Sequence, residues 1–187
     1  MNILLRILSV FGVLLLSPLI IISCLLVLLE DGLPILFIQE RIGKNEELFK
    51  LYKIRTMYRE TPSLGTHEIS TNNYLNFGKF LRKYKIDELP QLINFILGDL
   101  NLVGPRPGLI NQKDLSHFRR SRNIFKIKPG ITGFSQVLGY DMSNPELLSK
   151  IDSIYLENQS LLLDVEIFFA TFIKVLRVRL TNKFIKD

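Results

Sequence analysis

A long apolar segment near the start of the chain constrains its structure more than any other feature. Between Arg6 and Glu30 lie 23 residues, Ile7 to Leu29, in which Cys24 carries the one ionisable side chain. A transmembrane helix needs roughly 20 apolar residues. A secretory signal has a shorter apolar region, about 7–15 residues, and a small-residue cleavage site, whereas the neighbours of Cys24 are mostly bulky. We therefore expect a membrane-bound protein, with a lipoprotein signal at Cys24 as a minor alternative.

A Ser-Pro pair interrupts this segment near its middle. Pro18 has no N–H to bond the carbonyl of Leu14, and its ring clashes with that carbonyl, so a helix through this point bends. The Ser17 hydroxyl can bond the carbonyl of Val13 or Leu14 instead. Two topologies are open. Tolerance of proline in membrane helices favours a bent helix that spans the bilayer, whereas the short halves and the basic Arg6 favour a re-entrant helix–break–helix.

From Glu30 onward the composition is that of a globular domain. This part carries 23 of the 24 basic residues and all 18 acidic ones, and the chain has a net charge of +6. The positive charge predicts an anionic partner, such as acidic lipid, a phosphorylated small molecule or nucleic acid. One cysteine and two histidines argue against disulfides and against Cys or His metal sites, so any metal is expected to be held by oxygen. We expect a membrane segment, residues 1–29, and a membrane-associated domain, residues 30–187.

A predicted hairpin begins this domain. Residues 34–41 and 48–57 have the pattern of two strands, with Gly43 in the turn between them. Because side chains alternate along a strand, Lys53 and Arg55 lie on the same side of the second strand. Two neighbouring cations suit a phosphate, and a solvated strand face explains them equally well.

The rest of the domain is predicted to be mostly helical, which makes the fold α+β with a small sheet. Residues 60–73, rich in Thr, Ser, Pro, Gly and Asn, are expected to form a loop. Helical periodicity covers residues 75–83, 88–97, 109–120, 145–156 and 161–178. The last helix carries Phe168, Phe169 and Phe172 near one side and ends in basic residues. An interfacial amphipathic helix on anionic lipid has this pattern, and so does a core-facing helix with a basic last turn.

Opposite charges gather just before one predicted helix. Asp87 and Glu88 follow Lys83 and Lys85, and Pro90, which fits only the first helical turn, indicates a helix start near Asp87. The positive helix end and the lysines favour an ionised Asp87 and attract a phosphate. An ionised aspartate beside a phosphate is suited to act as a nucleophile, with Glu88 holding Mg²⁺. Helix capping is the commoner explanation of such a pair.

Two further segments carry a cation on a stiff backbone. Pro105 and Pro107 flank Arg106, which lowers the entropy lost when its guanidinium binds a phosphate. Lys128 opens a Lys-Pro-Gly-Ile-Thr-Gly turn of a kind that can surround an anion. Ordinary turn formation explains each segment as well, but three phosphate-suited segments in one short membrane-bound chain favour a phosphorylated substrate.

Seven segments share their residues and their order with one known family. They are Ser17-Pro18, Phe37 to Gly43, Phe49 to Met57, Asp87 to Asn94, Val103 to Pro107, Lys128 to Gly133, and Asp152 to Asp164. On these segments, which cover nearly the whole chain, it resembles the bacterial sugar transferases of the small monotopic phosphoglycosyl transferase family.

The resemblance implies a reaction and roles for the residues singled out above. The reaction is transfer of a sugar 1-phosphate from a UDP-sugar to polyprenyl (undecaprenyl) phosphate, the first membrane step in the assembly of a glycoconjugate. Asp87 would carry the phospho-sugar between two half-reactions, and Glu88 would belong with Asp87 to a Mg²⁺ site. The expected phosphate contacts are Lys53, Arg55, Arg106 and Lys128.

The resemblance also implies where the protein acts. It implies a re-entrant helix broken at Ser17 and Pro18, against the preference from proline tolerance, and a place at the cytoplasmic face of the bacterial inner membrane. A lipid phosphate leaves the bilayer at a cost of about 0.8 kcal/mol per exposed CH₂, so the active site must come to the interface. Anionic lipid is then a further partner. Downstream glycosyltransferases and a second copy of the chain stay open as partners.

Three residues depart from the family pattern, and two other functions compete. Ser9 stands where an Asp is usual before the apolar run, Phe134 where a Trp is usual, and Tyr140 where an Arg is common, so that one anion contact is lost.

A membrane-anchored nucleotide-sugar binding or scaffold protein is the main alternative, against which the intact Asp87 and Glu88 argue. A nucleic-acid binder is the other, and the chain lacks a recognition helix or an aromatic stacking motif for it.

Overall fold

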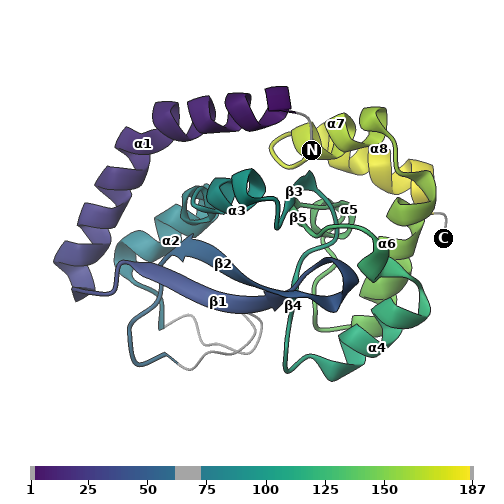
Figure 1. The fold of residues 1–187 in the computed structure, drawn as a ribbon, viewed down its shortest axis with the longest axis horizontal. Helices are drawn as coiled ribbons and strands as arrows, with labels where there is room; N and C mark the ends of the chain where they lie inside the picture. The colour runs from purple at the N-terminus through teal and green to yellow at the C-terminus, as the bar shows by residue number, and fades with distance from the viewer. Residues whose placement is uncertain (1–2, 62–72, 186–187) are drawn as a thin grey trace. The chain divides into compact units, whose positions relative to one another are not determined.

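The structure is a computed structural model that describes residues 3–61 and 73–185. Within these residues the fold is mostly helical with a small sheet component, as predicted (Figure 1). The helices are α1 Ile3–Asp31, α2 Asn76–Lys83, α3 Gln91–Leu97, α4 Lys113–Ser121, α5 Phe134–Val137, α6 Pro145–Asn158, α7 Leu161–Ala170 and α8 Lys174–Phe184. The strands are β1 Leu36–Ile42, β2 Leu48–Ile54, β3 Asn101–Val103, β4 Gly108–Leu109 and β5 Gly130–Thr132, and short 3-10 turns are η1 Lys44–Glu46, η4 Ile86–Glu88 and η5 Ile124–Lys126. The loop expected over residues 60–73 lies mostly outside the described residues.

By its internal contacts the chain divides into two compact units. The first unit comprises Met1–Glu40 and Lys50–Gly98, and the second comprises Arg41–Phe49 and Asp99–Asp187. The expected division into residues 1–29 and 30–187 concerns the bilayer rather than these contacts, and it stays a prediction.

The apolar segment forms one long helix, α1. Within its stretch Ser9–Asp31, an 18-residue window has a mean hydropathy of 2.8, and the stretch is long enough to cross a membrane. The helix continues through Pro18 and bends along its length (Figure 1). The Ser17 hydroxyl donates to the Leu14 carbonyl over 2.7 Å, which confirms the expected compensation, because Pro18 leaves this carbonyl without its helical donor. The expected helix–break–helix is thus a single bent helix, and its re-entrant path through a bilayer stays a prediction.

The second half of α1 packs against the rest of the first unit. Val27 is fully buried in an apolar cluster with Ile54, Leu75 and Leu81. These residues come from α1, from the end of β2, from the position just before α2 and from α2 itself, and α1 also contacts α3. One face of α1 is therefore fixed to the folded part of its unit.

Strands β1 and β2 form the expected hairpin. In the turn between them, the Gly43 N–H donates to the Glu47 carbonyl over 2.8 Å and Asn45 has a φ of 54°. Asparagine tolerates this left-handed conformation better than most residues, which explains its place in the turn. The far end of β1 pairs antiparallel with β4, with Arg41 opposite Leu109.

Two of the expected helices match α2 and α6 closely, and a third begins later than predicted. The matches are to residues 75–83 and 145–156. The helix expected over residues 109–120 starts only at Lys113, because Gly108–Leu109 form β4 and pair with β1. Periodicity cannot detect this short strand, since two residues carry no pattern.

The helix expected over residues 161–178 is divided into α7 and α8. Arg177 lies on α8, and its Nε donates to the carbonyl of Ala170, the last residue of α7, over 2.6 Å. Its Nη2 donates to the carbonyl of Thr171. The guanidinium thus satisfies carbonyls at the end of α7 that have no helical partner, which stabilises the break.

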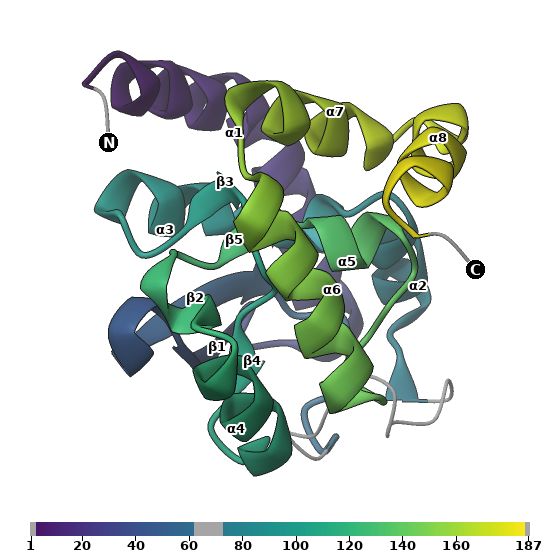
Figure 2. The same ribbon diagram turned by 90° about the vertical axis from the view of Figure 1, so that its right-hand side faces the viewer.

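The second unit is built around α6 and a pair of parallel strands. In Figure 2, α6 runs beside α5, and α7 begins at the end of α6. β3 pairs with β5, and a Cβ on Gly130 of β5 would overlap the backbone of Gly104 just after β3, so only glycine allows this approach. Phe134, which departs from the family pattern, is buried in the core. This core comprises Val103, Phe134, Val137, Ile151, Tyr155, Leu163, Ile167, Ala170 and Leu180.

Candidate functional site

Asp87 and Glu88 lie in the 3-10 turn η4, which precedes α3. Lys85, just before the turn, has a left-handed φ of 57°, and α3 begins at Gln91. The predicted helix start near Asp87 is therefore wrong. Pro90 has no N–H to donate, so regular α-helical geometry starts only after it. Asp87 is 4% exposed, so this carboxyl group is shielded from bulk water.

Glu88 faces a lysine on each side of its carboxylate. The Nζ atom of Lys53 lies 2.8 Å from Oε1, and the Nζ atom of Lys85 lies 3.8 Å from Oε2. The side chains of Lys53 and Glu88 are both 12% exposed, so water and salt screen their attraction only weakly. The structure thus brings Lys53, predicted as a phosphate contact, to the carboxylate pair, and its contact with phosphate stays a prediction.

Asn94 fixes α3 to the strand that carries Lys53. Its Oδ1 accepts from the backbone N–H of Tyr52 over 3.1 Å, and its Nδ2 donates to the carbonyl of Lys50 over 2.7 Å. The side chain is fully buried. Asn94 belongs to the segment that matches the family, but its partners are more than 40 residues away in sequence, so no local pattern could assign this role.

Arg55 follows directly after β2 and is buried, with 6% of its surface exposed. Its Nη1 contacts the carboxylate of Asp31 at the end of α1. Its Nε donates to the Pro34 carbonyl over 2.6 Å, and its Nη2 donates to the Gly32 carbonyl over 2.7 Å. The prediction that Arg55 contacts phosphate stays a prediction, and in the structure its charge is balanced by Asp31.

Arg106 lies in the second unit, in a loop whose backbone is held by two other arginines. The Nη1 atom of Arg119 donates to the Arg106 carbonyl over 2.7 Å, and the Nη1 atom of Arg41 donates to the Pro107 carbonyl over 3.1 Å. The two flanking prolines restrict the same backbone. The Arg106 side chain is partly exposed. It extends from a loop whose conformation these contacts restrict.

Arg119 is itself held by a buried ion pair. Its Nη2 and Nε atoms lie 2.6 and 3.1 Å from Oδ2 of Asp152, and Ser135 donates to Oδ1 over 2.9 Å. The side chains of Arg119 and Asp152 are 3% and 2% exposed. This network connects α4, α5 and α6 with the Arg106 loop. The family match includes Asp152, whereas the sequence analysis missed Arg119, because its partner is 33 residues away along the chain.

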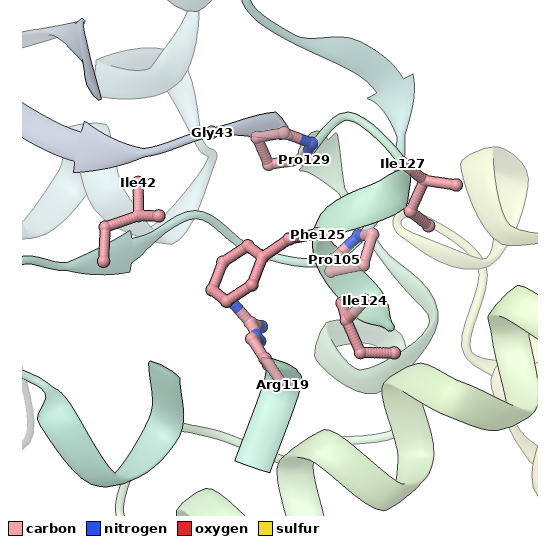
Figure 3. A pocket seen from close by; sticks show the side chains of 8 residues that line it. All are labelled: Ile42, Gly43, Pro105, Arg119, Ile124, Phe125, Ile127 and Pro129. Atoms are coloured by element: carbon pink, nitrogen blue, oxygen red, sulfur yellow. The ribbon is translucent and has the colours of Figure 1, made fainter. Parts of the chain in front are cut away.

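A hollow lies beside this loop in the second unit (Figure 3). It is partly open to solvent and is lined by Ile42, Gly43, Pro105, Arg119, Ile124, Phe125, Ile127 and Pro129. The space inside that a water centre can occupy is about 10 Å³. This is room for about one water molecule, so the hollow is too small to hold a nucleotide sugar by itself. Lys128 lies between two of the lining residues in sequence, and its backbone carbonyl packs against Gly104.

The carboxylates in the first unit fit a magnesium ion by their chemistry. Among residues 3–61 and 73–185, no group of three or more His, Cys, Asp or Glu side chains is placed to hold a metal. Mg²⁺ is commonly bound through one or two carboxylates, with water and substrate phosphate as the other ligands. Asp87 and Glu88 supply two such carboxylates, and a cation there would compete with Lys53 and Lys85 for Glu88.

Comparison with known proteins supplies the family. The sequence pattern described as "Bacterial sugar transferase" matches residues 2–178. The chain is 39% identical over 160 residues to the uncharacterized sugar transferase EpsL of Bacillus subtilis. The aligned residues cover 86% of this chain and 79% of EpsL.

Two further relatives are named for a specific reaction. The UDP-N-acetylgalactosamine-undecaprenyl-phosphate N-acetylgalactosaminephosphotransferase of Aeromonas hydrophila is 36% identical over 90% of this chain and 41% of its own length. The UDP-glucose:undecaprenyl-phosphate glucose-1-phosphate transferase of Xanthomonas campestris is 33% identical over 91% of this chain and 37% of its own length. The chain thus spans most of EpsL but less than half of these two relatives.

Proposed function

The chain belongs to the bacterial sugar transferase family, and from this membership we propose that it transfers a sugar 1-phosphate from a UDP-sugar to undecaprenyl phosphate. The names of the relatives support both the donor class and the lipid acceptor. The observation in the structure that supports the reaction best is the enclosed carboxyl group of Asp87 beside the pair of Lys53 and Glu88.

We propose that the reaction proceeds through two displacements at one phosphorus atom. In the first, a carboxylate oxygen of Asp87 bonds to the sugar-bearing phosphorus of the donor, and the bond from that phosphorus to the bridging oxygen breaks, which releases UMP. In the second, a phosphate oxygen of the lipid bonds to the same phosphorus and the Asp87 carboxylate leaves. Each displacement forms one P–O bond and breaks one, so the enzyme returns to its starting state.

The charged groups around Asp87 would support both displacements. When Mg²⁺ is bound it supplies positive charge to the diphosphate oxygens. Lys53 and Lys85 hold Glu88 in place, and their ammonium groups favour anionic phosphate at the same turn. For Arg106 and Lys128, which belong to the second unit, phosphate contact stays a prediction from the sequence, because both are cations on a backbone of restricted conformation.

The exposed apolar surfaces suit a protein seated at a membrane. On α7, on α8 and between them, large apolar side chains are exposed at Leu161, Leu162, Val165, Phe168, Phe169, Phe172, Val175 and Val178. The ring of Phe168, on α7, lies 5.9 Å from the ring of Phe172, just after the end of α7. We propose that this face enters the lipid interface, that α1 is re-entrant, and that the protein acts at the cytoplasmic face of the inner membrane.

Intact-protein mass spectrometry tests the proposal. The purified protein is incubated with Mg²⁺ and each of four donors, UDP-glucose, UDP-galactose and their two N-acetyl forms, without lipid acceptor. We expect a mass increase of one hexose or N-acetylhexosamine phosphate with one donor, and release of one equivalent of UMP. Asp87→Asn should abolish both, whereas Asp114→Asn, at an exposed aspartate in the second unit, should abolish neither. Donor binding without UMP release would favour the nucleotide-sugar binding or scaffold protein instead.

A further inference from the structure

The end of α1 is attached to the first unit by two acidic residues. The carboxylate of Glu30 accepts from the backbone N–H groups of Asn76 and Phe77 over 2.6 and 3.2 Å. These N–H groups belong to the first turn of α2, which has no side-chain cap of its own, so Glu30 takes that role. The next residue, Asp31, contacts the Arg55 guanidinium. Acidic side chains at this point also mark where an apolar helix leaves hydrocarbon, because charge is costly inside the bilayer.

Arg55 holds most of the turn through which the chain leaves α1, and Arg59 donates to the remaining Leu33 carbonyl. All three of its guanidinium nitrogens donate to the segment from Asp31 to Pro34. The backbone N–H of Arg55 also donates to the Ile35 carbonyl over 2.9 Å. The guanidinium is planar and rigid, so acceptors that bond it together must keep fixed positions relative to one another. The turn that supplies these acceptors therefore has one strongly preferred conformation. Residues 31–34 thus form the exit turn of α1.

The same stretch of chain holds the carboxylate pair. Lys53, in β2, contacts Glu88. Arg55, two residues later in the chain, contacts Asp31. Arg55 and Lys53 are 6% and 12% exposed, so both ion pairs are largely shielded from water. The exit of the membrane helix and the turn that carries Asp87 are thus attached to one short segment, residues 53–55, within one unit. A shift of the Arg55–Asp31 contact would therefore reach the Lys53–Glu88 contact through only two residues of chain.

We infer that Asp31 and Arg55 are positioning residues that set the height of Asp87 relative to the lipid surface. The inference rests on the proposed function, because the height of Asp87 matters only if a lipid phosphate attacks there. The long chain of the acceptor stays in the bilayer, so its phosphate reaches a narrow range of heights. A nucleotide sugar arrives from water and has no such limit. Disturbing the exit turn therefore impairs the acceptor half-reaction and spares the donor half-reaction.

The test compares the two half-reactions in Asp31→Asn, with the full chain in lipid nanodiscs. The donor half-reaction is the rate of UMP release in a single turnover without acceptor. The acceptor half-reaction is the consumption of the phospho-sugar enzyme by undecaprenyl phosphate in the nanodisc. A third arm uses farnesyl phosphate in detergent, whose short chain does not hold the phosphate at one height. Arg59→Gln is the matched control. Arg59 lies 3.7 Å from the same Asp31 carboxylate and donates to the Leu33 carbonyl over 3.2 Å, but its side chain is 57% exposed, so water can replace both contacts.

We expect Asp31→Asn to raise the KM for undecaprenyl phosphate by roughly tenfold, since a misplacement of about 1 Å can cost on the order of 100-fold. The donor half-reaction and the farnesyl phosphate arm should stay within about twofold of the wild type, and Arg59→Gln should behave as the wild type throughout. Hydrogen exchange at the Arg55 amide should rise in Asp31→Asn. If Asp31→Asn does not fold, Asp31→Glu, which keeps the charge but moves the carboxylate by one methylene group, replaces it.

Each other outcome overturns a stated claim. An unchanged KM for undecaprenyl phosphate, or an equal loss with farnesyl phosphate, overturns the inference alone. A slower donor half-reaction in Asp31→Asn, or in Asp31→Glu where that variant replaces it, also overturns the inference. A wild-type protein that releases no UMP with any of the four donors overturns the proposed function, and the inference with it.

Discussion

The ammonium group of Lys53 lies 2.8 Å from Oε1 of Glu88, and the two side chains are equally shielded from solvent. This ion pair joins strand β2 to the turn that carries Asp87. A charge in such a place depends on its partner, because water cannot replace the lost interaction fully. The pair therefore has a measurable role in stability apart from any role in catalysis.

The first prediction concerns this pair. Lys53→Met and Glu88→Gln should each lower the free energy of unfolding by about 1–2 kcal/mol, between the values for surface and buried pairs. The double variant should lose clearly less than the sum, because neither charge is then left alone. Thermal unfolding of the four proteins in one detergent measures the coupling. Strictly additive losses would show that the two side chains do not interact in solution.

The second prediction concerns the buried pair of Arg119 and Asp152. Asp152→Asn should cost about 3–5 kcal/mol, because it leaves the guanidinium enclosed without a counter-charge. Ser135→Ala, which removes one hydrogen bond to the same carboxylate, should cost about 1 kcal/mol. Glu46→Gln is the control, since its partner Arg120 lies on the surface, and it should change the melting temperature little. Equal losses for Asp152→Asn and Glu46→Gln would contradict this account.

The third prediction concerns the close contact of β3 and β5. Gly130→Ala should destabilise the second unit by about 1–3 kcal/mol or more, because the added Cβ would overlap the backbone of Gly104 and force the strands apart. Gly12→Ala is the matched control, because an added Cβ there has nothing within 4 Å. Thermal unfolding of both variants checks the difference. A Gly130→Ala protein as stable as Gly12→Ala would mean that the strands are not this close.

The fourth prediction concerns pH. Burial raises the pKa of Asp164, and the hydrogen bond from the Tyr155 hydroxyl, 2.7 Å long, opposes this shift. The folded protein therefore binds this proton more tightly than the unfolded chain, so stability falls as the pH rises from the ordinary carboxyl range through the raised pKa. Asp164→Asn, which keeps an acceptor for Tyr155, should raise the melting temperature at neutral pH and leave it unchanged in acid. A variant less stable than the wild type at neutral pH would reverse the sign.

The fifth prediction concerns the path of α1 through the bilayer. In a Cys24→Ala background, single cysteines at positions 2 and 187 should both react with an impermeant thiol reagent from the cytoplasmic side. Replacing Pro18 with Leu together with Ser17→Ala should straighten the helix and move position 2 to the opposite side. Labelling of positions 2 and 187 from opposite sides in the wild type would rule out the re-entrant path.

Local patterns were sufficient for the parts of the fold that local forces decide. The hairpin followed from two strand-like segments around Gly43, and the bond from Ser17 to Leu14 followed from the missing N–H of Pro18. Helices α2 and α6 followed from apolar periodicity. In each case the determining partners are within a few residues in the sequence.

Long-range contacts account for what the sequence left open. The partners of Arg55 in the exit turn are more than 20 residues away, and nothing near Arg55 in the sequence distinguishes a structural guanidinium from one that binds phosphate. The division of α7 from α8 depends on Arg177 capping the preceding helix, which an apolar pattern running through both segments conceals. The sequence pattern around Gly130 predicts a turn. In the structure, glycine is required there because the backbone of Gly104, just after β3, leaves no room for a Cβ atom.

The hydrogen bond from Ser17 to Leu14 has a consequence for how α1 acquires its shape. Because the bent helix supplies the missing donor from its own next turn, the bend needs neither a second subunit nor a water molecule to satisfy the Leu14 carbonyl. The bend is therefore complete as soon as the segment is made, before any substrate or neighbouring protein is met.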